Sequence, residues 1–296
     1  MAVLAVDIGG TKMAAAIVED DGTVRAGGGV VATPATDEPA AIWDALATLV
    51  SGVAGSGAPE VCGVGCGGPM DADTVSPLNI PGWRGFPLRD RLRALTGLDV
   101  FVDNDAKALA LAEGWIGAAR GEPNFVAMVV STGVGGGIVL DGRLLEGAGG
   151  NAGHIGHVIV EPGGEACACG ANGCLEAVAS GLAIERITGR PAAEADDGMR
   201  ARVGRLVGRA VADVANLLDL RLAVVAGSVA LGYGPLFFAA AQAELDACSR
   251  LEFSRGARIV PAGLGPDGPL VGAAAVGLRG TGRLAGGAIG GAGREG

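Results

Sequence analysis

The stretch from Gly153 to Glu176 constrains this chain more than any other, because metal-binding residue types gather there in one short segment. It holds both histidines of the protein and three of its six cysteines, namely His154, His157, Cys167, Cys169 and Cys174. Zinc prefers four tetrahedral ligands drawn from thiolate and imidazole groups, and one histidine with three cysteines is a common structural set. We therefore predict one zinc ion bound by His157 and these three cysteines.

Two ordinary explanations compete with a zinc site. Cysteines are often simply buried, and the close pair of histidines can arise by chance. A disulfide within Cys167-Ala-Cys169 would have poor geometry. Gly170 and Gly173 favour the metal, because glycine lets the backbone turn tightly enough for three thiolates to face one point. The cysteine spacing, together with both histidines, makes zinc the preferred interpretation.

Length, charge and cysteine usage bound the class of protein. A chain of 296 residues, 49% of them hydrophobic, has room for one large or two medium domains. Glycine or charge interrupts every apolar stretch before about 18 residues, so no membrane span is expected. Residues 1–7 lack a basic region, which argues against a signal peptide. We expect a cytoplasmic protein with reduced thiols. The net charge of −10 disfavours nucleic acid as the main partner.

A glycine-rich turn lies between two apolar runs near the start of the chain. Residues 2–8 predict a buried strand, Gly9-Gly10-Thr11-Lys12 a turn, and residues 13–18 a second strand before the hairpin turn Asp21-Gly22. A Walker loop or a dinucleotide fingerprint would lead into a helix instead. Backbone N–H groups and the hydroxyl here can surround a phosphate, and Asp7 can orient a hydrated Mg²⁺. Taken alone, the motif is equally well explained as an ordinary glycine hairpin.

The same pattern returns in the middle of the chain. Residues 125–130 predict a strand, 131–137 form the run Ser-Thr-Gly-Val-Gly-Gly-Gly, and 138–140 predict a second strand before Asp141-Gly142. This internal echo indicates two domains of the same ancestry, each offering a glycine-rich hairpin to a phosphate. The predicted fold class is therefore α/β with two related domains.

Polar residues follow two other predicted strands. Strand 61–66 runs into a Gly-Gly-Pro turn, and strand 100–102 delivers Asp103-Asn104-Asp105 to a helix over 106–116. Ligands of open α/β sheets bind at the carboxyl ends of strands. Backbone groups near Gly68 are therefore candidate substrate contacts, although the glycines alone can explain the turn. Capping the helix requires only one of the three polar residues, so three in succession favour chemistry.

The remaining elements complete a two-domain chain. Apolar spacing predicts further helices over 38–55, 88–95, 175–187, 202–218, 236–251 and 270–278. Further strands are predicted over 24–31, 222–226 and 258–260. The predicted division is 1–118 with a returning helix over about 268–280, then 119–267 with the loop 153–176, then a flexible glycine-rich tail over 281–296.

Four motifs resemble the sugar-kinase branch of the ROK family (repressors, open reading frames, kinases), within the actin, hexokinase and Hsp70-like ATPase superfamily. They are Asp7-Ile-Gly-Gly-Thr-Lys12, Asn104-Asp105, the run 131–137, and Cys-x-Cys-Gly-x2-Gly-Cys-x-Glu after a Gly-His pair. The resemblance covers nearly the whole chain, although His157 and Cys167 stand further apart than in the family pattern. It implies two ribonuclease H-like, actin-like ATPase domains with a cleft between them. The phosphate motif begins at residue 7, so no winged-helix domain is expected and the kinase branch is favoured.

The resemblance implies roles in sugar binding and catalysis. Asp105 would be the catalytic general base, and Asn104 would hold neighbouring sugar hydroxyls. The zinc-binding His157 and the Glu176 that follows the last cysteine would also contact the sugar. The zinc itself would be structural, because four protein ligands leave it no open position. Family members are often dimeric, so a homodimer or a higher homo-oligomer is expected.

The resemblance also implies the nucleotide contacts. The ATP phosphates would contact the two glycine-rich turns through Gly9, Gly10, Thr11, Lys12, Thr132 and Gly133. Asp7 would position Mg²⁺ through water. Gly227 and Ser228 match the strand-to-helix turn that lies near the adenosine in such kinases.

One departure from the family pattern concerns the sugar. Many glucokinases of the family have Glu-x-Gly-His, and this chain has His154 at the position of that glutamate. The variant Gly-His-Ile-Gly-His resembles bacterial N-acetylmannosamine kinases. A glutamate accepts two hydroxyl hydrogen bonds, whereas a neutral histidine offers one donor and one acceptor. We therefore expect His154 to alter recognition at the anomeric end or C2 of the sugar.

The resulting hypothesis is ATP-dependent phosphorylation of the 6-hydroxyl of a hexose or N-acetylhexosamine, with glucose, mannose or N-acetylmannosamine as candidate substrates. A second hypothesis is a non-catalytic, sugar-sensing ROK protein, which an intact Asp105 and both glycine turns disfavour. A third is a zinc-dependent hydrolase. Three cysteine ligands and no spare histidine to activate water argue against it.

Overall fold

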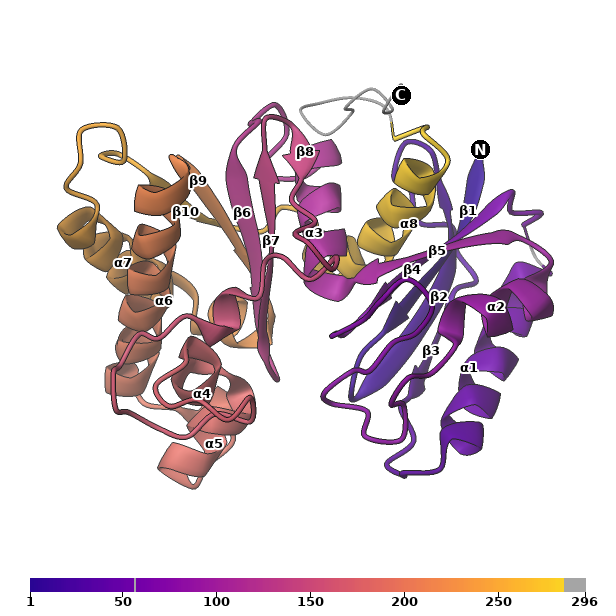
Figure 1. Cartoon of the computed structure of the whole chain (residues 1–296), viewed down its shortest axis with the longest axis horizontal. Helices are drawn as coiled ribbons and strands as arrows, with labels where there is room; N and C mark the ends of the chain where they lie inside the picture. Colours follow the sequence, from indigo (N-terminus) through magenta and orange to yellow (C-terminus); the bar gives the residue numbers. More distant parts are fainter. Residues whose placement is uncertain (56, 285–296) are drawn as a thin grey trace.

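The computed structural model describes residues 1–55 and 57–284, and they form two lobes that each contain a five-stranded sheet (Figure 1). The strand orders are β3-β2-β1-β4-β5 and β10-β9-β6-β7-β8. Each sheet has an antiparallel three-stranded meander extended by two parallel strands. This repeated order confirms the predicted α/β fold class. Residues 285–296 of the predicted tail lie outside the described residues.

The first lobe carries the first glycine-rich turn at the edge of its core. Its strands are β1 (Ala2–Ile8), β2 (Lys12–Glu19), β3 (Gly29–Ala32), β4 (Val61–Cys66) and β5 (Asp99–Asn104). Its outer helices are α1 (Pro39–Ala54) and α2 (Leu88–Thr96). The third strand was predicted over 24–31 but begins only at Gly29, because Gly27 turns the chain with φ +94°. Val24 makes only an isolated bridge to Val18.

The second lobe repeats the arrangement, and its second strand is longer than predicted. Its strands are β6 (Phe125–Val130), β7 (Val134–Leu140), β8 (Arg143–Leu144), β9 (Leu222–Ala226) and β10 (Arg258–Pro261). The prediction that residues 135–137 belong to the turn was wrong, since β7 begins at Val134. A Cβ on Gly137 would lie 2.8 Å from the Cα of Lys107, so glycine within the strand lets a helix approach closely.

The helices of the second lobe differ from prediction at two breaks. They are α4 (Leu175–Ala179), α5 (Gly181–Thr188), α6 (Asp197–Leu218) and α7 (Ser228–Cys248), with short 3₁₀ turns η1 (Ile155–His157), η2 (Ala192–Glu194) and η3 (Gly265–Asp267). The single helix predicted over 175–187 is divided at Ser180, whose hydroxyl caps α5 by accepting from the N–H of Ala183 at 3.1 Å. Helix α7 begins earlier than predicted and is kinked at Gly234 before Pro235.

Two helices lie between the lobes. Helix α3 (Asp105–Trp115) contacts strands of both sheets, and α8 (Gly268–Gly280) packs against α3 and the first sheet (Figure 1). The buried carboxylate of Glu113 accepts hydrogen bonds from the N–H groups of Ala118 at 2.7 Å and Gly263 at 3.1 Å. Through these hydrogen bonds Glu113 joins the two segments, around Ala118 and around Gly263, in which the chain passes from one lobe to the other. The predicted domain boundaries themselves stay predictions.

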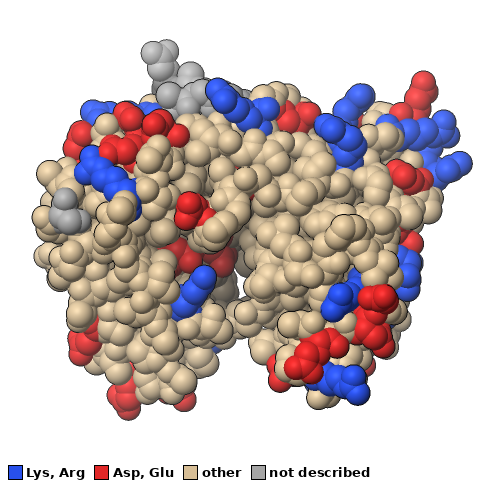
Figure 2. Space-filling model, turned by 180° about the vertical axis from the view of Figure 1, so that it is seen from behind, with Lys and Arg blue, Asp and Glu red and all other residues tan. Residues whose placement is uncertain are grey.

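Two further features of the described residues are the distribution of surface charge and the character of the helices. On the face shown in Figure 2, the described Lys and Arg side chains are interspersed with Asp and Glu and form no broad basic area. Within residues 1–55 and 57–284, no helix combines the length and apolar character that crossing a membrane requires.

Candidate active site

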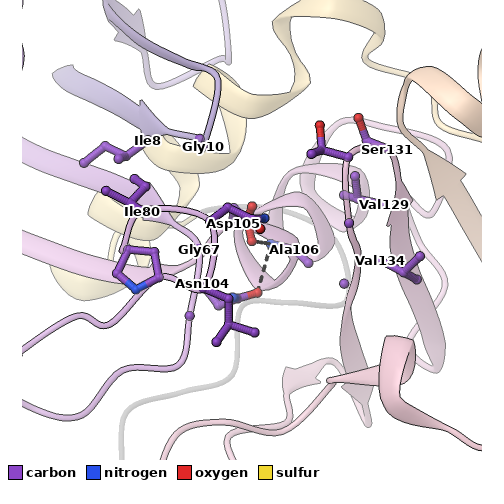
Figure 3. Close-up of a pocket in the computed structure, with 18 of the residues that line it drawn as sticks. Ile8, Gly10, Gly67, Ile80, Asn104, Asp105, Ala106, Val129, Ser131 and Val134 are labelled. Carbon is purple, nitrogen blue, oxygen red and sulfur yellow. Dashed lines mark hydrogen bonds between the residues drawn. The ribbon is translucent and has the colours of Figure 1, made fainter. Parts of the chain in front are cut away.

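A cavity of about 240 Å³ between the lobes brings together most of the residues predicted to bind sugar and phosphate (Figure 3). The predicted residues that line it are Asp7, Gly9, Gly10, Thr11, Lys12, Gly68, Asn104, Asp105, Thr132, Gly133, His154, His157 and Glu176. The predicted residues outside this lining are Gly227, Ser228, Cys167, Cys169 and Cys174. The proposed roles of all these residues stay predictions.

The junction of β5 and α3 presents the two polar residues predicted for the sugar. The side-chain oxygen Oδ1 of Asn104 caps α3 by accepting from the N–H of Ala106 at 3.0 Å and of Lys107 at 3.4 Å. Its amide nitrogen is therefore left to face Gly68, where a Cβ would lie 3.2 Å away. Asp105 accepts from the N–H of Ala106 at 2.8 Å and faces the cavity (Figure 3). The same helix terminus thus orients an amide donor and a carboxylate side by side.

Asp7 and Asp105 concentrate negative charge at the floor of the cavity. Burial raises the pKa of Asp7 to about 7, the charge of Asp105 adds to this rise, and Lys12 opposes it. The Asp105 side chain is exposed to solvent in the cavity. Desolvation by the surrounding protein nevertheless raises its pKa, and the hydrogen bond from the Ala106 N–H opposes this rise. Two neighbouring carboxylates are hard oxygen ligands of the kind Mg²⁺ prefers. The residues present therefore fit a divalent cation.

The two glycine-rich turns face each other across the cavity (Figure 3). In the first, the N–H of Gly9 donates to the carbonyl of Lys12 at 3.0 Å. In the second, the N–H of Ser131 donates to the carbonyl of Gly133 at 2.9 Å. The hydroxyls of Ser131 and Ser228 lie 2.9 Å apart, which places the predicted adenosine contacts beside the second turn. Residues predicted to bind the nucleotide thus come from distant parts of the chain to both sides of the cavity.

The predicted zinc ligands converge on one point. The ligand atoms of His157 and the three cysteines all lie within 4.8 Å of one another. The sulfurs of Cys169 and Cys174 are 3.7 Å apart, and the sulfur of Cys167 lies 3.7 Å from Nδ1 of His157. Tetrahedral zinc with Zn–S bonds of about 2.3 Å separates its sulfur ligands by about 3.8 Å. The donor set therefore fits a closed structural zinc site.

One glycine explains how the zinc loop folds so tightly. Gly173 has φ +80°, and a Cβ there would lie 1.9 Å from the carbonyl oxygen of Glu161. The N–H of Cys167 donates to the carbonyl of Ala171 at 2.8 Å and closes the turn that carries the ligands. These backbone features bring the candidate ligands close together.

His154 and Glu176 reach the cavity from either side of the zinc loop. The ring of His154 lies 3.8 Å from the position of a Cβ on Gly68, and its centroid is 6.1 Å from that of His157. Burial, followed by the neighbouring His157, lowers the pKa of His154, so its imidazole is neutral at pH 7. Glu176 accepts a hydrogen bond from the N–H of Val134 at 2.9 Å.

Three residues at this site escaped the sequence analysis. Asn79 lines the cavity, and a Cβ on Gly10 would lie 2.6 Å from that of Asn79. Asn151 bonds the backbone of Met70, accepting from its N–H at 3.3 Å and donating to its carbonyl at 3.0 Å. Lys107 is buried behind the site. The first two lie in loops without periodicity, and a lysine within an apolar helix gave no signal of its partners.

The paired sheets, the hinge helices and the glycine hairpins on both sides of the cleft define a protein of the actin-like ATPase superfamily. The chain belongs to the ROK family, whose profile matches residues 3–279. It is 40% identical over 253 residues to an N-acetylmannosamine kinase of Escherichia fergusonii, covering 80% of this chain and 86% of the relative.

Solved structures show the same similarity. A ROK family glucokinase from Streptomyces griseus, in complex with glucose and AMPPNP, superposes with a TM-score of 0.83 at 31% identity and covers 94% of this chain and 100% of its own. A ROK hexokinase from Thermus thermophilus has a TM-score of 0.79 at 34% identity, with coverage of 95% and 99%. The family resemblance inferred from the motifs is therefore confirmed.

Proposed function

We propose that this protein is a sugar kinase that transfers the γ-phosphoryl group of ATP to the 6-hydroxyl of N-acetylmannosamine. The observation that carries the proposal is the position of His154 beside Gly68, close to the Asn104–Asp105 junction. Similarity to N-acetylmannosamine kinase and to ROK glucokinase and hexokinase supports the broader assignment to sugar kinases. Glucose and mannose are the competing substrates.

In the proposed reaction, Asp105 accepts the proton of the attacking hydroxyl. The sugar oxygen forms a bond to the γ-phosphorus, the bond from that phosphorus to the β–γ bridging oxygen breaks, and ADP leaves. The Asn104 amide donates to a neighbouring sugar hydroxyl and so orients the acceptor. Enclosure raises the pKa of Asp105, which increases its affinity for the incoming proton.

The glycine-rich turns would hold the phosphates, and phosphoryl transfer depends mostly on such positioning and on charge neutralisation. When bound, Mg²⁺ supplies part of that neutralisation, and Asp7 would hold it through water. His157, Cys167, Cys169 and Cys174 would hold zinc as a brace of the sugar-binding loop. Closure of the lobes would exclude water, which otherwise competes with the sugar as nucleophile.

The assay that tests the proposal compares four acceptors at equal concentrations. We would measure ADP release with N-acetylmannosamine, N-acetylglucosamine, mannose and glucose, and determine kcat/KM for each. N-acetylmannosamine is expected to be the best by at least tenfold. A clear preference for glucose would contradict the substrate assignment. Sugar binding without any ADP release would indicate instead a non-catalytic sugar sensor.

The variant His154→Glu supplies the matched specificity control, because it restores the glutamate of many family glucokinases. We expect it to shift the ratio of kcat/KM values toward glucose. An unchanged ratio would show that His154 does not set the preference.

Size-exclusion chromatography with light scattering on the same preparations tests the proposed homodimer or higher oligomer. Fractionation of expressing cells tests the proposed cytoplasmic location.

A further inference from the structure

Four charged side chains form a closed ring between the two lobes. Lys107 lies 3.0 Å from the carboxylate of Asp103, and Arg279 lies 3.6 Å from its other oxygen. Glu146 contacts both Lys107 and Arg279 and so completes the ring. The Lys107 side chain is only 2% exposed. A buried ammonium is tolerated only when its charge and its donors are matched.

The ring and one backbone carbonyl surround the buried ammonium. Nζ of Lys107 donates to Glu146 and to the carbonyl of Gly150, the latter at 3.1 Å, and it forms an ion pair with Asp103. A lysine has three N–H donors. Two positive and two negative groups alternate around the ring, so its net charge is zero. Lys107 is therefore a fixed attachment point rather than a mobile side chain.

The members of the ring come from elements that meet between the two lobes. Asp103 lies on β5, Lys107 on α3 and Arg279 in the last turn of α8. Glu146 alone belongs to the second lobe, in the loop that follows β8. Figure 1 shows α3 between the second sheet and α8. The ring thus ties a loop of the second lobe to the helices that separate the lobes.

The tied loop leads directly to the sugar-facing histidine. The N–H of Ala152 donates to the carbonyl of Glu146 at 3.0 Å, which closes the segment Glu146–Gly153 on itself. Asn151 bonds the backbone of Met70, two residues after Gly68. We refer to residues 146–153 as the bridging loop. The ring holds one side of this loop and the turn at Met70 holds the other, and His154 follows immediately.

We propose that Lys107 and Glu146 are positioning residues for sugar recognition, because they hold the bridging loop where His154 meets the acceptor. This inference rests on the proposed sugar kinase function. Gly147, Gly150 and Gly153 have φ values of +74°, +78° and +104°, so the loop backbone is intrinsically permissive. Without its anchors the loop must be ordered when sugar binds, and that entropy cost weakens binding.

The variant Glu146→Gln tests this positioning role. We expect the KM and the calorimetric Kd for N-acetylmannosamine to rise about tenfold, while kcat and the KM for ATP stay within twofold of wild type. The conservative Glu146→Asp is expected to restore sugar KM to within about threefold. A fall in kcat with unchanged sugar KM and Kd would indicate a merely structural role and overturn the inference.

Glu244→Gln is the matched control. It removes the 2.7 Å ion pair between Arg209 and Glu244, which joins α6 and α7 away from the cavity. We expect its sugar KM to equal that of wild type. An equal rise of sugar KM in Glu244→Gln and Glu146→Gln would show that any lost ion pair has the same effect, and would overturn the inference.

A double variant protects the test against misfolding. Lys107→Met with Glu146→Gln leaves Asp103 paired with Arg279, so no buried charge is stranded. It is expected to fold, to keep kcat and to show the same rise in sugar KM. Hydrogen exchange in the sugar-free protein supplies an independent readout, with faster exchange expected in residues 146–153 of each ring variant. Unchanged hydrogen exchange in residues 146–153 would refute the anchoring of the loop, whether or not the wild-type protein phosphorylates sugar. Absence of sugar phosphorylation by the wild-type protein would refute the proposed function, which is a separate result.

Discussion

The carboxylate of Glu176 accepts a hydrogen bond of 2.9 Å from the backbone N–H of Val134. Glu176 lies in the first turn of α4, two residues after Cys174, and Val134 begins β7 directly after the second glycine-rich turn. One side chain therefore links the predicted zinc-braced loop to the predicted phosphate turn. This bond engages the Oε2 atom, and Oε1 is the acceptor expected for the predicted contact with a sugar hydroxyl.

This link predicts a graded response to substitution at position 176. Glu176→Ala removes both the bond to Val134 and the predicted sugar contact, so we expect kcat/KM for sugar to fall about 100-fold or more. Glu176→Gln keeps an acceptor oxygen and is expected to lose about tenfold. Steady-state kinetics with both substrates varied provides the measurement. Equal losses in the two variants would show that the bond to Val134 contributes nothing.

A second prediction concerns the pH dependence of catalysis. A general base must be ionised, and enclosure raises the pKa of Asp105 above its ordinary value of about 3.9. The kcat/KM for sugar should therefore fall as pH decreases, with a midpoint higher than that of an ordinary aspartate. Asp105→Asn is expected to lower kcat by about 10³-fold while sugar still binds by calorimetry. Substantial turnover by this variant would remove Asp105 from the proposed role.

A third prediction concerns Asp7, whose buried carboxylate is expected to lower the stability of the folded protein while serving the proposed function. Its folded pKa of about 7 exceeds the value of about 3.9 expected in the unfolded chain. Between these values the folded state holds a proton that the unfolded state has released, so the free energy of unfolding falls as pH rises through that window. Above pH 7 the whole of this decrease in the free energy of unfolding persists. Asp7→Asn should therefore raise Tm at pH 8 by a few degrees and lose this advantage toward pH 4.

Thermal unfolding without nucleotide or Mg²⁺, at pH values from 4 to 8, checks this sign. Asp21 is a control of opposite sign, because the N–H of Thr23 lowers its pKa. The stability that Asp21 contributes is present above the unfolded pKa and is lost as pH falls through the folded one. Asp21→Ala should accordingly lower Tm at pH 8 and approach wild type in acid. A lower Tm for Asp7→Asn than for wild type at pH 8 would contradict the prediction.

Local patterns were sufficient to predict most of the sheets. Strands β4, β6 and β9 begin and end at the predicted residues, because short apolar runs bounded by turn residues are typical of buried strands. The start of β7 was missed for a physical reason. Gly135, Gly136 and Gly137 look like a turn, but they lie in a strand whose lack of side chains admits α3 and the loop before His154.

The parts of the candidate site that consist of residues close together in the sequence were predictable. The zinc ligands and the glycine-rich turns are such motifs, and the structure brings each set together. The ring of Lys107, Asp103, Glu146 and Arg279 was not predictable, since its members come from four elements and meet only through the tertiary fold. The contact of Asn151 with Met70 is of the same kind.

The last prediction concerns removal of the metal. The structure of the zinc loop depends on donors that are otherwise four separate polar groups, so zinc binding should contribute directly to folding. We expect about one zinc per chain by elemental analysis and a fall in Tm after treatment with a chelator at neutral pH. Because the metal would be structural, sugar KM should rise along with the loss of stability, and added Zn²⁺ should restore both. Cys169→Ser should behave like the chelated protein, whereas Cys248→Ser, which lies in α7, should bind zinc as wild type does. A chelated protein that kept its Tm and lost only kcat would instead assign the metal to the reaction.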